Sequence, residues 1–165
     1  MKGTLCVNGK TIEIDISDED LKKFFPEKKT GYERAEGNDR YFCILSDGFV
    51  INTLDRHINS DNILYDTANY YTDHDLAARC SRADTLYRNL RRFTATNREK
   101  EIDWDSVTSE KYFIRYTGFW LEASSFHNTN SFGTIYFDSK ATAQAAINLF
   151  RDELMWYFTE FKDTI

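Results

Sequence analysis

The chain has few residues of the kinds that cross-link a protein or bind a metal. Its three cysteines in 165 residues, Cys6, Cys43 and Cys80, are far apart and follow no CxxC or Cys/His spacing. Cys43 and Cys80 stand where apolar residues would fit, so we expect small buried thiols in a reducing compartment rather than disulfides or a metal site. At this length one domain can bury its own core without such staples.

Long apolar runs are absent too. No stretch approaches the roughly 18 apolar residues that a membrane-spanning helix needs. The N-terminal residues have the pattern of a hairpin rather than of a signal peptide. The sequence therefore predicts a soluble cytoplasmic protein that has no membrane partner.

Signatures of common active sites are missing. The seven glycines form neither a GxGxxG motif nor a phosphate-binding loop, and the chain contains no GxSxG or HExxH. Asp73-His74-Asp75 could supply metal ligands, but Thr72 followed by acidic residues is also what a helix N-terminus favours. His57 and His127 have no companion at ligand spacing. We expect a binding protein rather than an enzyme, without catalytic residues, metal or cofactor, and a weak hydrolase that uses His74 ranks last.

The charge is unevenly spread along the chain. The net charge is −6, but residues 67–100 carry seven basic and four acidic side chains, whereas the segments before and after them carry −4 and −5. One basic segment thus lies between two acidic ones, and this polarity could steer a charged partner. The acidic total argues against general nucleic-acid binding.

Aromatic residues are abundant, and the segments that contain them repeat in order. They make up 16% of the chain and favour a sheet-rich core. Two hairpins are predicted from short apolar segments, Tyr41–Leu45 with Phe49–Thr53, and Tyr112–Tyr116 with Phe119–Ser124. Each hairpin is followed by a polar insert, a further strand and a helix, and the further strands are expected at Ile63–Tyr71 and Gly133–Phe137. An order of elements that is used twice indicates an internal repeat.

Both copies are expected to end in an amphipathic helix. In the first copy, apolar positions recur at alternating steps of four and three, at Leu76, Cys80, Ala83, Tyr87, Leu90 and Thr94. The second copy has a comparable seam at Ala143, Ala146, Phe150, Leu154, Tyr157 and Phe161. Thr72 is the expected N-cap of the first helix, and Asp138 or Ser139 that of the second.

The N-terminal residues form a separate subunit in this interpretation. Asn8-Gly9 supplies the two positive φ angles of a type I′ hairpin turn, and Ser17 caps a short helix that ends before Pro26. We therefore predict an α+β fold in which a hairpin and a short helix precede two tandem ββ(β)α units. The predicted ranges are 1–37 for the N-terminal subunit, 38–165 for the duplicated core, 40–97 for copy one and 111–161 for copy two. The pattern allows the copies to form one sheet or two.

Three arginines of the first helix are the first candidates for binding. Arg88, Arg91 and Arg92 lie on the face opposite to the apolar seam, and guanidinium groups there could bind phosphate or an acidic protein surface. A solvated face explains them as well, because the dipole favours cations near a helix C-terminus and Asp84 could pair with Arg88.

The second candidates belong to copy two. Trp120, Phe126 and His127 combine aromatic anchors with polar groups, as recognition surfaces do. Since side chains alternate between the two faces of a strand, a second packed layer could equally cover the aromatic residues. Binding and core packing are both open at these positions.

Five segments resemble small proteins of phages, prophages and mobile elements of Firmicutes: Val7–Ile14, Thr30–Arg34, Leu90–Phe93, Ile135–Ser139 and Asp152–Phe158. The resemblance spans most of the chain. It implies an accessory protein that binds a host factor in stoichiometric amounts, and some proteins of this kind are anti-CRISPR inhibitors of Cas nucleases. It assigns no catalytic or binding residue.

The leading hypothesis is a non-enzymatic phage or mobile-element protein that inhibits a bacterial defence nuclease, such as Cas9, by covering a functional surface. The expected contact residues are Arg88, Arg91, Arg92, Trp120, Phe126 and His127. The first alternative is a nucleic-acid-binding protein or repressor that uses the basic helix 75–97. The second is a protein that sequesters a nucleotide signal between the repeats.

Overall fold

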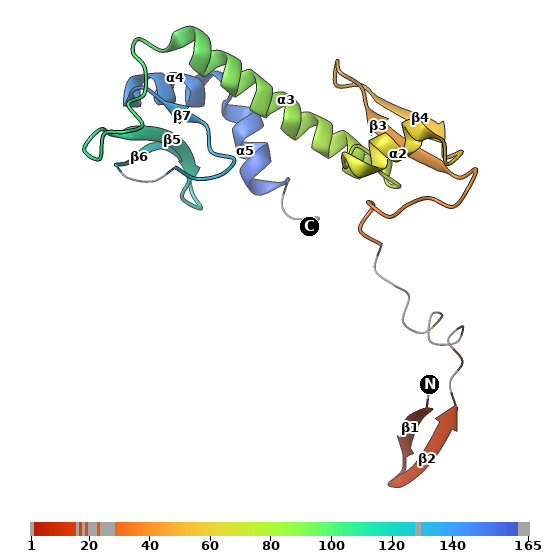
Figure 1. Cartoon of the computed structure of the whole chain (residues 1–165). Coiled ribbons are helices and arrows are strands. Elements are labelled where there is room, and N and C mark those ends of the chain that lie inside the picture. Colours follow the sequence, from red (N-terminus) through yellow and green to blue (C-terminus); the bar gives the residue numbers. More distant parts are fainter. Residues whose placement is uncertain are drawn as a thin grey trace. The chain divides into compact units, whose positions relative to one another are not determined.

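The computed structural model describes residues 2–15, 17, 19, 23, 29–127 and 130–161, and it has the predicted α+β class (Figure 1). The chain divides into two compact units, Met1–Thr30 and Gly31–Ile165. The strands form three separate antiparallel sheets, one in the first unit and two in the second. The two predicted copies therefore do not share a sheet.

The first unit contains the predicted N-terminal hairpin. β1 (Lys2–Val7) pairs with β2 (Lys10–Asp15), and the turn residues Asn8 and Gly9 have φ values of 51° and 77°. Both positive angles are what a type I′ turn needs, so the Asn-Gly prediction is confirmed. The short helix predicted after Ser17 falls mostly outside the described residues.

Residues 31–37, which we predicted to belong to the N-terminal subunit, pack within the second unit. The carbonyl of Gly31 accepts a hydrogen bond from the Thr72 amide at 2.7 Å, and the Ala35 amide donates to the Tyr70 hydroxyl at 3.0 Å. These contacts join the segment to residues almost forty positions further along the chain. Such long-range pairing leaves no local sequence signal.

The second unit begins with a small module, residues 31–73, which we call the first module. β3 (Arg40–Ile44) and β4 (Val50–Leu54) form the predicted hairpin, and α2 (Asn59–Asp66) follows it. The strand predicted at Ile63–Tyr71 is wrong: helix α2 occupies its first half, and only a single bridge between Tyr71 and Phe42 remains of the strand. The pattern missed α2 because its one buried residue is an aspartate, Asp61, and not an apolar side chain.

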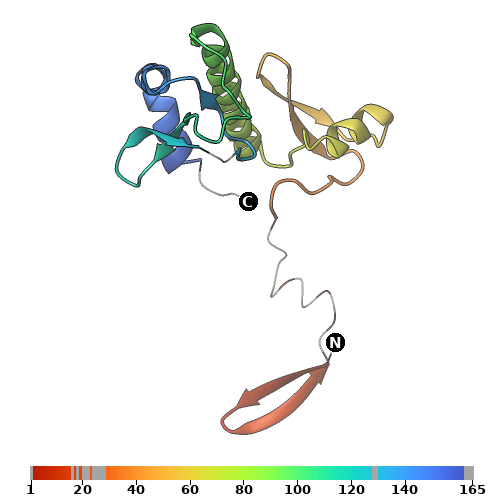
Figure 2. The same ribbon diagram turned by 60° about the vertical axis from the view of Figure 1, so that its left-hand side comes forward.

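Helix α3 (His74–Asn97) is the predicted helix of copy one, but it serves both copies. Its N-cap is Asp73 and not Thr72, because the Asp73 carboxylate accepts the Leu76 amide at 2.8 Å. Leu76 and Ala77 pack on the first module, whereas Leu86 and Leu90 pack in the core of the residues that follow. Figure 2 shows α3 as the element that the two parts of this unit share.

The second module consists of residues 98–127 and 130–161. β5 (Lys111–Tyr116) lies between β6 (Leu121–Phe126) and β7 (Tyr136–Phe137), which confirms the second hairpin and the third strand, although β7 is shorter than predicted. The single helix predicted here is two helices, α4 (Lys140–Leu149) and α5 (Arg151–Thr159), which meet at Phe150. Ser139 is the N-cap, with its hydroxyl accepting the Thr142 amide at 3.1 Å.

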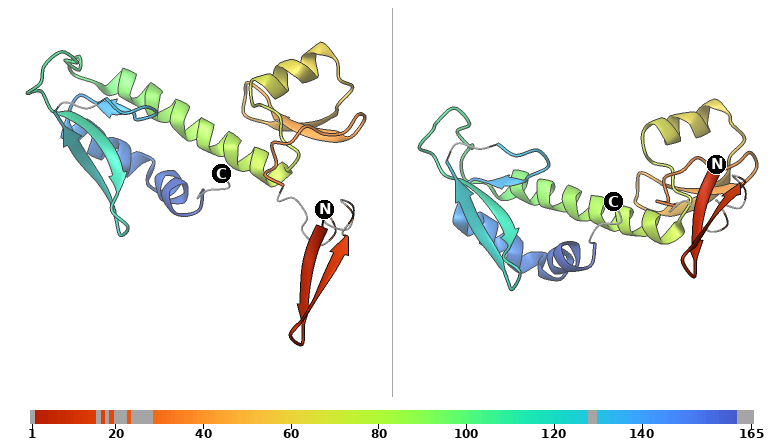
Figure 3. Two further views of the ribbon diagram at one scale, coloured as in Figure 1. Left: turned by 60° about the horizontal axis from the view of Figure 1, so that its bottom comes forward. Right: turned by 90° about the horizontal axis from the view of Figure 1, so that it is seen from below.

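The second module contains the larger apolar cluster, although it also buries Lys111, Asp138 and Thr142. Ala143 and Ala146 are fully buried, and so is Ile147, so α4 lies close to the sheet as the small residues predict. Figure 3 shows α4 and α5 beside the strands, with α3 along the same side. The buried members of the cluster are Leu86, Leu90, Phe137, Ala143, Ala146, Ile147 and Leu154.

Candidate functional site

A buried polar cluster in the first module has the residue types of an active site. Asp55, with none of its surface exposed, accepts hydrogen bonds from Arg34 Nε at 2.5 Å, from Arg34 Nη2 at 3.0 Å and from the Tyr70 hydroxyl at 2.7 Å. The amide of His57 adds a bond at 2.7 Å. The Arg34 guanidinium, helped by the His57 amide and the Tyr70 hydroxyl, holds the pKa of Asp55 far below its usual range, despite burial of the carboxyl.

The same cluster extends to a second carboxylate. Asp61 accepts the Tyr41 hydroxyl at 2.9 Å and the Arg56 amide at 2.9 Å, and the rings of Tyr41 and Tyr70 stack with their centroids 4.0 Å apart. Burial, together with the hydrogen bond to Asp55, raises the pKa of Tyr70 to about 12. Each buried group is thus held in one protonation state by another group of the cluster. This network of mutual hydrogen bonds stabilises the module.

The three predicted arginines come together on one exposed surface of α3. Arg88 donates to the Ser46 carbonyl at 3.2 Å, Arg92 donates to the Asn89 side chain at 3.1 Å, and the Arg91 guanidinium lies 5.9 Å from the centroid of the Tyr87 ring. Among the described residues none of the three forms an ion pair, and the predicted pair between Asp84 and Arg88 is not among the ion pairs there. We call Arg88, Arg91 and Arg92 the arginine surface.

Some other arginines of the second unit have carboxylate partners, whereas Arg40, Arg56 and Arg151 have none among the described residues. Arg34 pairs with Asp55 at 2.5 Å, Arg82 with Glu153 at 2.7 Å, and Arg115 with Glu122 at 2.5 Å. Carboxylates are therefore within reach of several guanidinium groups in this fold, but not of the arginine surface. No carboxylate of the described residues neutralises its three charges.

The aromatic candidates lie on the hairpin of the second module. Trp120 is exposed and donates its indole N–H to Glu122 at 3.2 Å. Phe126 is exposed too and stacks on Phe113 with the ring centroids 4.9 Å apart. The Nδ1 atom of His127 lies 3.2 Å from the Thr108 carbonyl oxygen, so we assign the proton to this nitrogen.

These residues do not form one surface with the arginines. Trp120 directly precedes β6 and Phe126 is its last residue, so their Cα atoms are about 20 Å apart along the strand. The arginine surface lies on the face of α3 opposite to Leu86 and Leu90, which pack on the second module. The structure thus gathers the three arginines but separates them from the aromatic residues.

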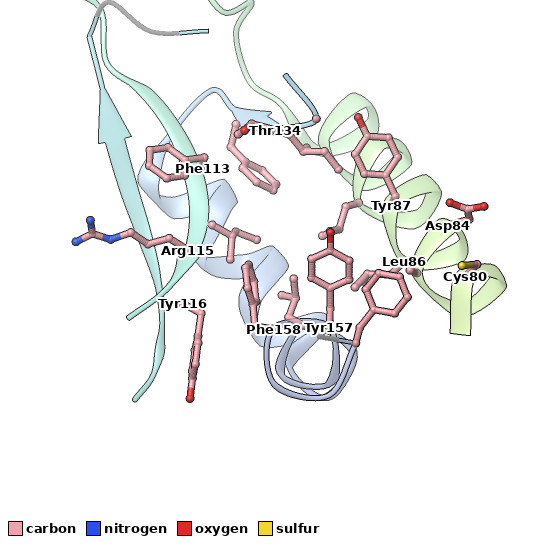
Figure 4. Close-up of a pocket in the computed structure, with 18 of the residues that line it drawn as sticks. Cys80, Asp84, Leu86, Tyr87, Phe113, Arg115, Tyr116, Thr134, Tyr157 and Phe158 are labelled. Carbon is pink, nitrogen blue, oxygen red and sulfur yellow. The ribbon is translucent and has the colours of Figure 1, made fainter. Parts of the chain in front are cut away.

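A cleft of about 680 Å³ opens between α3, β5 and α5 (Figure 4). The wall formed by α3 consists of Cys80, Ala83, Tyr87 and Leu90, together with Asp84 and Leu86. Four of these residues belong to the apolar seam that the sequence predicts for this helix. Part of the apolar face of α3 is therefore not covered by the core and lines the cleft instead.

The cleft is mainly apolar, and its size lies within the range of ligand pockets. Tyr87 and Tyr157 project toward it from α3 and α5, and each keeps 41% of its surface exposed (Figure 4). Arg115 turns away from the cleft and pairs with Glu122. A nucleotide needs cations for its phosphates, and the described lining offers none that is unpaired. The cleft therefore suits apolar groups better than a nucleotide signal.

The thiols follow the prediction in part. Cys43 is buried and Cys80 is half-buried in the wall of the cleft, while Cys6 is exposed, and all three are free. The Tyr32 hydroxyl lies 3.4 Å from the Cys80 sulfur. Burial, with this contact, raises the pKa of Tyr32 to about 12, so its hydroxyl stays protonated at neutral pH.

Comparisons with known proteins assign no function to these residues. No protein-family model, no curated protein and no solved structure matches the chain. Among the described residues, no three His, Cys, Asp or Glu side chains are grouped in a way that could hold a metal ion. None of the described helices combines the length and apolar character needed to cross a bilayer.

Proposed function

We propose that this protein works by binding another protein, and that the arginine surface contacts an acidic region of that partner. The observation that carries this proposal is the grouping of Arg88, Arg91 and Arg92 on one exposed surface of a single helix, where none of them forms an ion pair within the described residues. Guanidinium groups keep their charge and bind carboxylates through two parallel hydrogen bonds. A partner carboxylate would meet groups that are already positioned on a rigid helix.

A protein partner fits this surface better than a nucleic acid. Arg88 and Arg92 are separated by about 6 Å along the helix, so the surface can neutralise about three phosphates. Specific nucleic-acid binding usually involves more contacts, and the net charge of −6 opposes the approach of a polyanion. The repressor hypothesis remains testable, because it predicts a salt dependence that a gel-shift titration at two salt concentrations would show.

The more specific proposal is a phage or mobile-element protein that inhibits a bacterial defence nuclease, such as Cas9, without catalysis of its own. Its support is the resemblance of five sequence segments to proteins of Firmicutes phages. An inhibitor of this kind would cover a functional surface of the nuclease and bury about 800 Å² on each side. It would act stoichiometrically in the cytoplasm of the host cell.

A cleavage assay with a purified Cas9–guide complex tests this proposal. We expect one equivalent of the chain to suppress cleavage, and the variant R88E/R91E/R92E to need about 100-fold more protein. The matched control R40E/R56E/R151E makes the same charge change at three exposed arginines outside the arginine surface. Equal inhibition by the two triple variants would exclude the arginine surface, and no inhibition by any form would exclude Cas9.

A further inference from the structure

The arginine surface and the apolar cleft are neighbours on α3. Tyr87 lines the cleft, and Arg91 lies over its ring at 5.9 Å. Asp84, Tyr87, Arg88 and Arg91 occupy positions i, i+3, i+4 and i+7, which form one continuous stripe along a helix. A segment bound along this stripe would therefore contact both the charges and the cleft.

The charges on the stripe have a direction. Asp84 comes first along the helix, Arg88 and Arg91 follow it on the stripe within about two turns, and Arg92 lies beside the stripe. Asp84 is exposed, and among the described residues its carboxylate forms no ion pair. A partner would avoid placing carboxylates beside Asp84 and would gain from placing them beside the arginines. The stripe thus favours a segment that is acidic at one end.

The cleft offers the apolar half of a contact. Tyr87 and Tyr157 are each 41% exposed on opposite walls, and Leu90 and Leu154 lie among the lining residues. Binding hot spots are typically aromatic or arginine side chains in well-packed pockets, and the weaker contacts around them exclude water. A space of about 680 Å³ can accept one or two large side chains of a partner.

We infer that the cleft and the arginine surface form one docking site for an acidic segment of a partner protein. A large apolar side chain of that segment enters the cleft between Tyr87 and Tyr157. Its carboxylates lie on Arg88, Arg91 and Arg92. This inference rests on the proposed function and adds the chemistry of the bound segment.

Selection from a random library of 12-residue peptides tests the inference without a known partner. The immobilised full chain serves as the target, and the selected peptides are synthesised and titrated by fluorescence anisotropy. We expect the selected sequences to combine Asp or Glu with one large apolar residue. Basic or purely polar sequences, or no enrichment at all, would contradict the inference.

Two variants separate the cleft from the charges. Tyr157→Asp places a carboxylate in the cleft and should weaken the selected peptides at least about tenfold. The control F119D makes the same type of change at a residue that is 82% exposed and does not line the cleft, and it should leave the affinity unchanged. If R88E/R91E/R92E abolishes binding while Tyr157→Asp does not, the proposed function stands and the role of the cleft is refuted.

NMR on the unmodified chain guards against a variant that fails to fold. The apolar residue of a bound peptide should give nuclear Overhauser effects to the methyl groups of Leu90 and Leu154. Their absence at saturation would refute docking in the cleft. Displacement of the peptide by ADP would instead identify a nucleotide as the occupant, and would also contradict the inference.

Discussion

Each of the two modules in the second unit contains an antiparallel hairpin, but the two hairpins pack against different cores. In the first module, β3 turns Tyr41 and Cys43 toward a cluster that contains the buried Asp55 and Asp61. In the second, β5 packs against a larger apolar cluster, and the buried polar side chains of this module, Lys111, Asp138 and Thr142, form no comparable network with one another and with tyrosines among the described residues. In both modules the first strand of the hairpin pairs on its other edge with aromatic residues that precede a helix.

The difference follows from how much apolar surface each module can bury. The first module has two strands and the short helix α2, whereas the second has three strands and the two helices α4 and α5, and α3 packs on both modules. A small core gains little from hydrophobic burial, so polar groups that fix the geometry matter more. Similar sequence patterns thus specify similar topologies in which apolar burial and buried polar contacts contribute in different proportions.

Among the substitutions considered, removal of the Asp55 carboxylate should cause the largest loss of stability. Asp55→Ala leaves the Arg34 guanidinium and the Tyr70 hydroxyl without their partner, and we expect a loss of about 4 kcal/mol in the free energy of unfolding. Urea unfolding measures the loss, and hydrogen exchange should place it in β3 and β4. Glu122→Ala, which removes a more exposed pair with Arg115, is the control and should cost much less. An equal effect of both changes would disprove the special role of the buried cluster.

A cavity in the apolar core should be slightly less costly. Ile147→Ala removes a side chain that is almost completely buried against the sheet, and we expect a loss of about 3 kcal/mol. Leu149→Ala is the matched control on the same helix, since Leu149 is 64% exposed. Thermal unfolding compares the two. Faster exchange in β3 rather than in β5 would show that the modules are not separately stabilised.

Acid should affect the first module more, because it buries two carboxyl groups with lowered pKa values, Asp55 and Asp61, whereas Asp138 is the buried carboxyl group described in the second module. The pKa of Asp55 is held below its usual range in the folded state by Arg34, so its contribution is present above the pKa of an unfolded carboxyl, about 4. It is lost as the pH falls from that value toward the folded pKa. We expect hydrogen exchange at pH 3.5 to increase at Phe42 before it increases at Ile114. Asp55→Asn should remove most of this difference, and an unchanged difference would rule out Asp55 as its source.

The smallest expected effect concerns the contact of α3 with α5. The Arg82 guanidinium lies 3.9 Å from the centroid of the Trp156 ring and pairs with Glu153. Because both charged groups are partly exposed, Arg82→Ala should cost about 1 kcal/mol. Arg151→Ala, at an exposed arginine of α5, should leave the melting temperature unchanged. A loss as large as that of Ile147→Ala would mean that the helix contact carries more of the stability than we infer.

Local patterns predicted the elements that follow local rules. Alternating apolar residues identified both hairpins, Asn8-Gly9 identified the first turn, and the spacing of apolar residues identified α3. α2 was missed because it buries a carboxylate, and the break between α4 and α5 was missed because the apolar seam continues through Phe150. No proline or glycine in α2, or at the junction of α4 and α5, marks these features in the sequence.

The candidate site was predicted less well than the fold. The arginine surface could be recognised because Arg88, Arg91 and Arg92 are neighbours on a predicted helix. The cleft could not, since β5 and α5 reach α3 only through tertiary packing. The sequence did contain one indication of the cleft, because the apolar face of α3 is broad. Leu86 is buried in the core, whereas Tyr87, the next residue, remains 41% exposed. The cluster around Asp55 joins residues far apart in the sequence and had no such signal.

The most direct test of the proposed function is a parallel affinity capture from a Firmicutes lysate that contains a Cas9–guide complex, with quantitative mass spectrometry. The wild-type chain, R88E/R91E/R92E and the charge-matched control R40E/R56E/R151E are used as baits. We predict a protein that is retained in stoichiometric amounts by the wild type and by the control, and that is lost from R88E/R91E/R92E. Identical sets of retained proteins on all three baits would contradict the claim that this protein acts through its arginine surface.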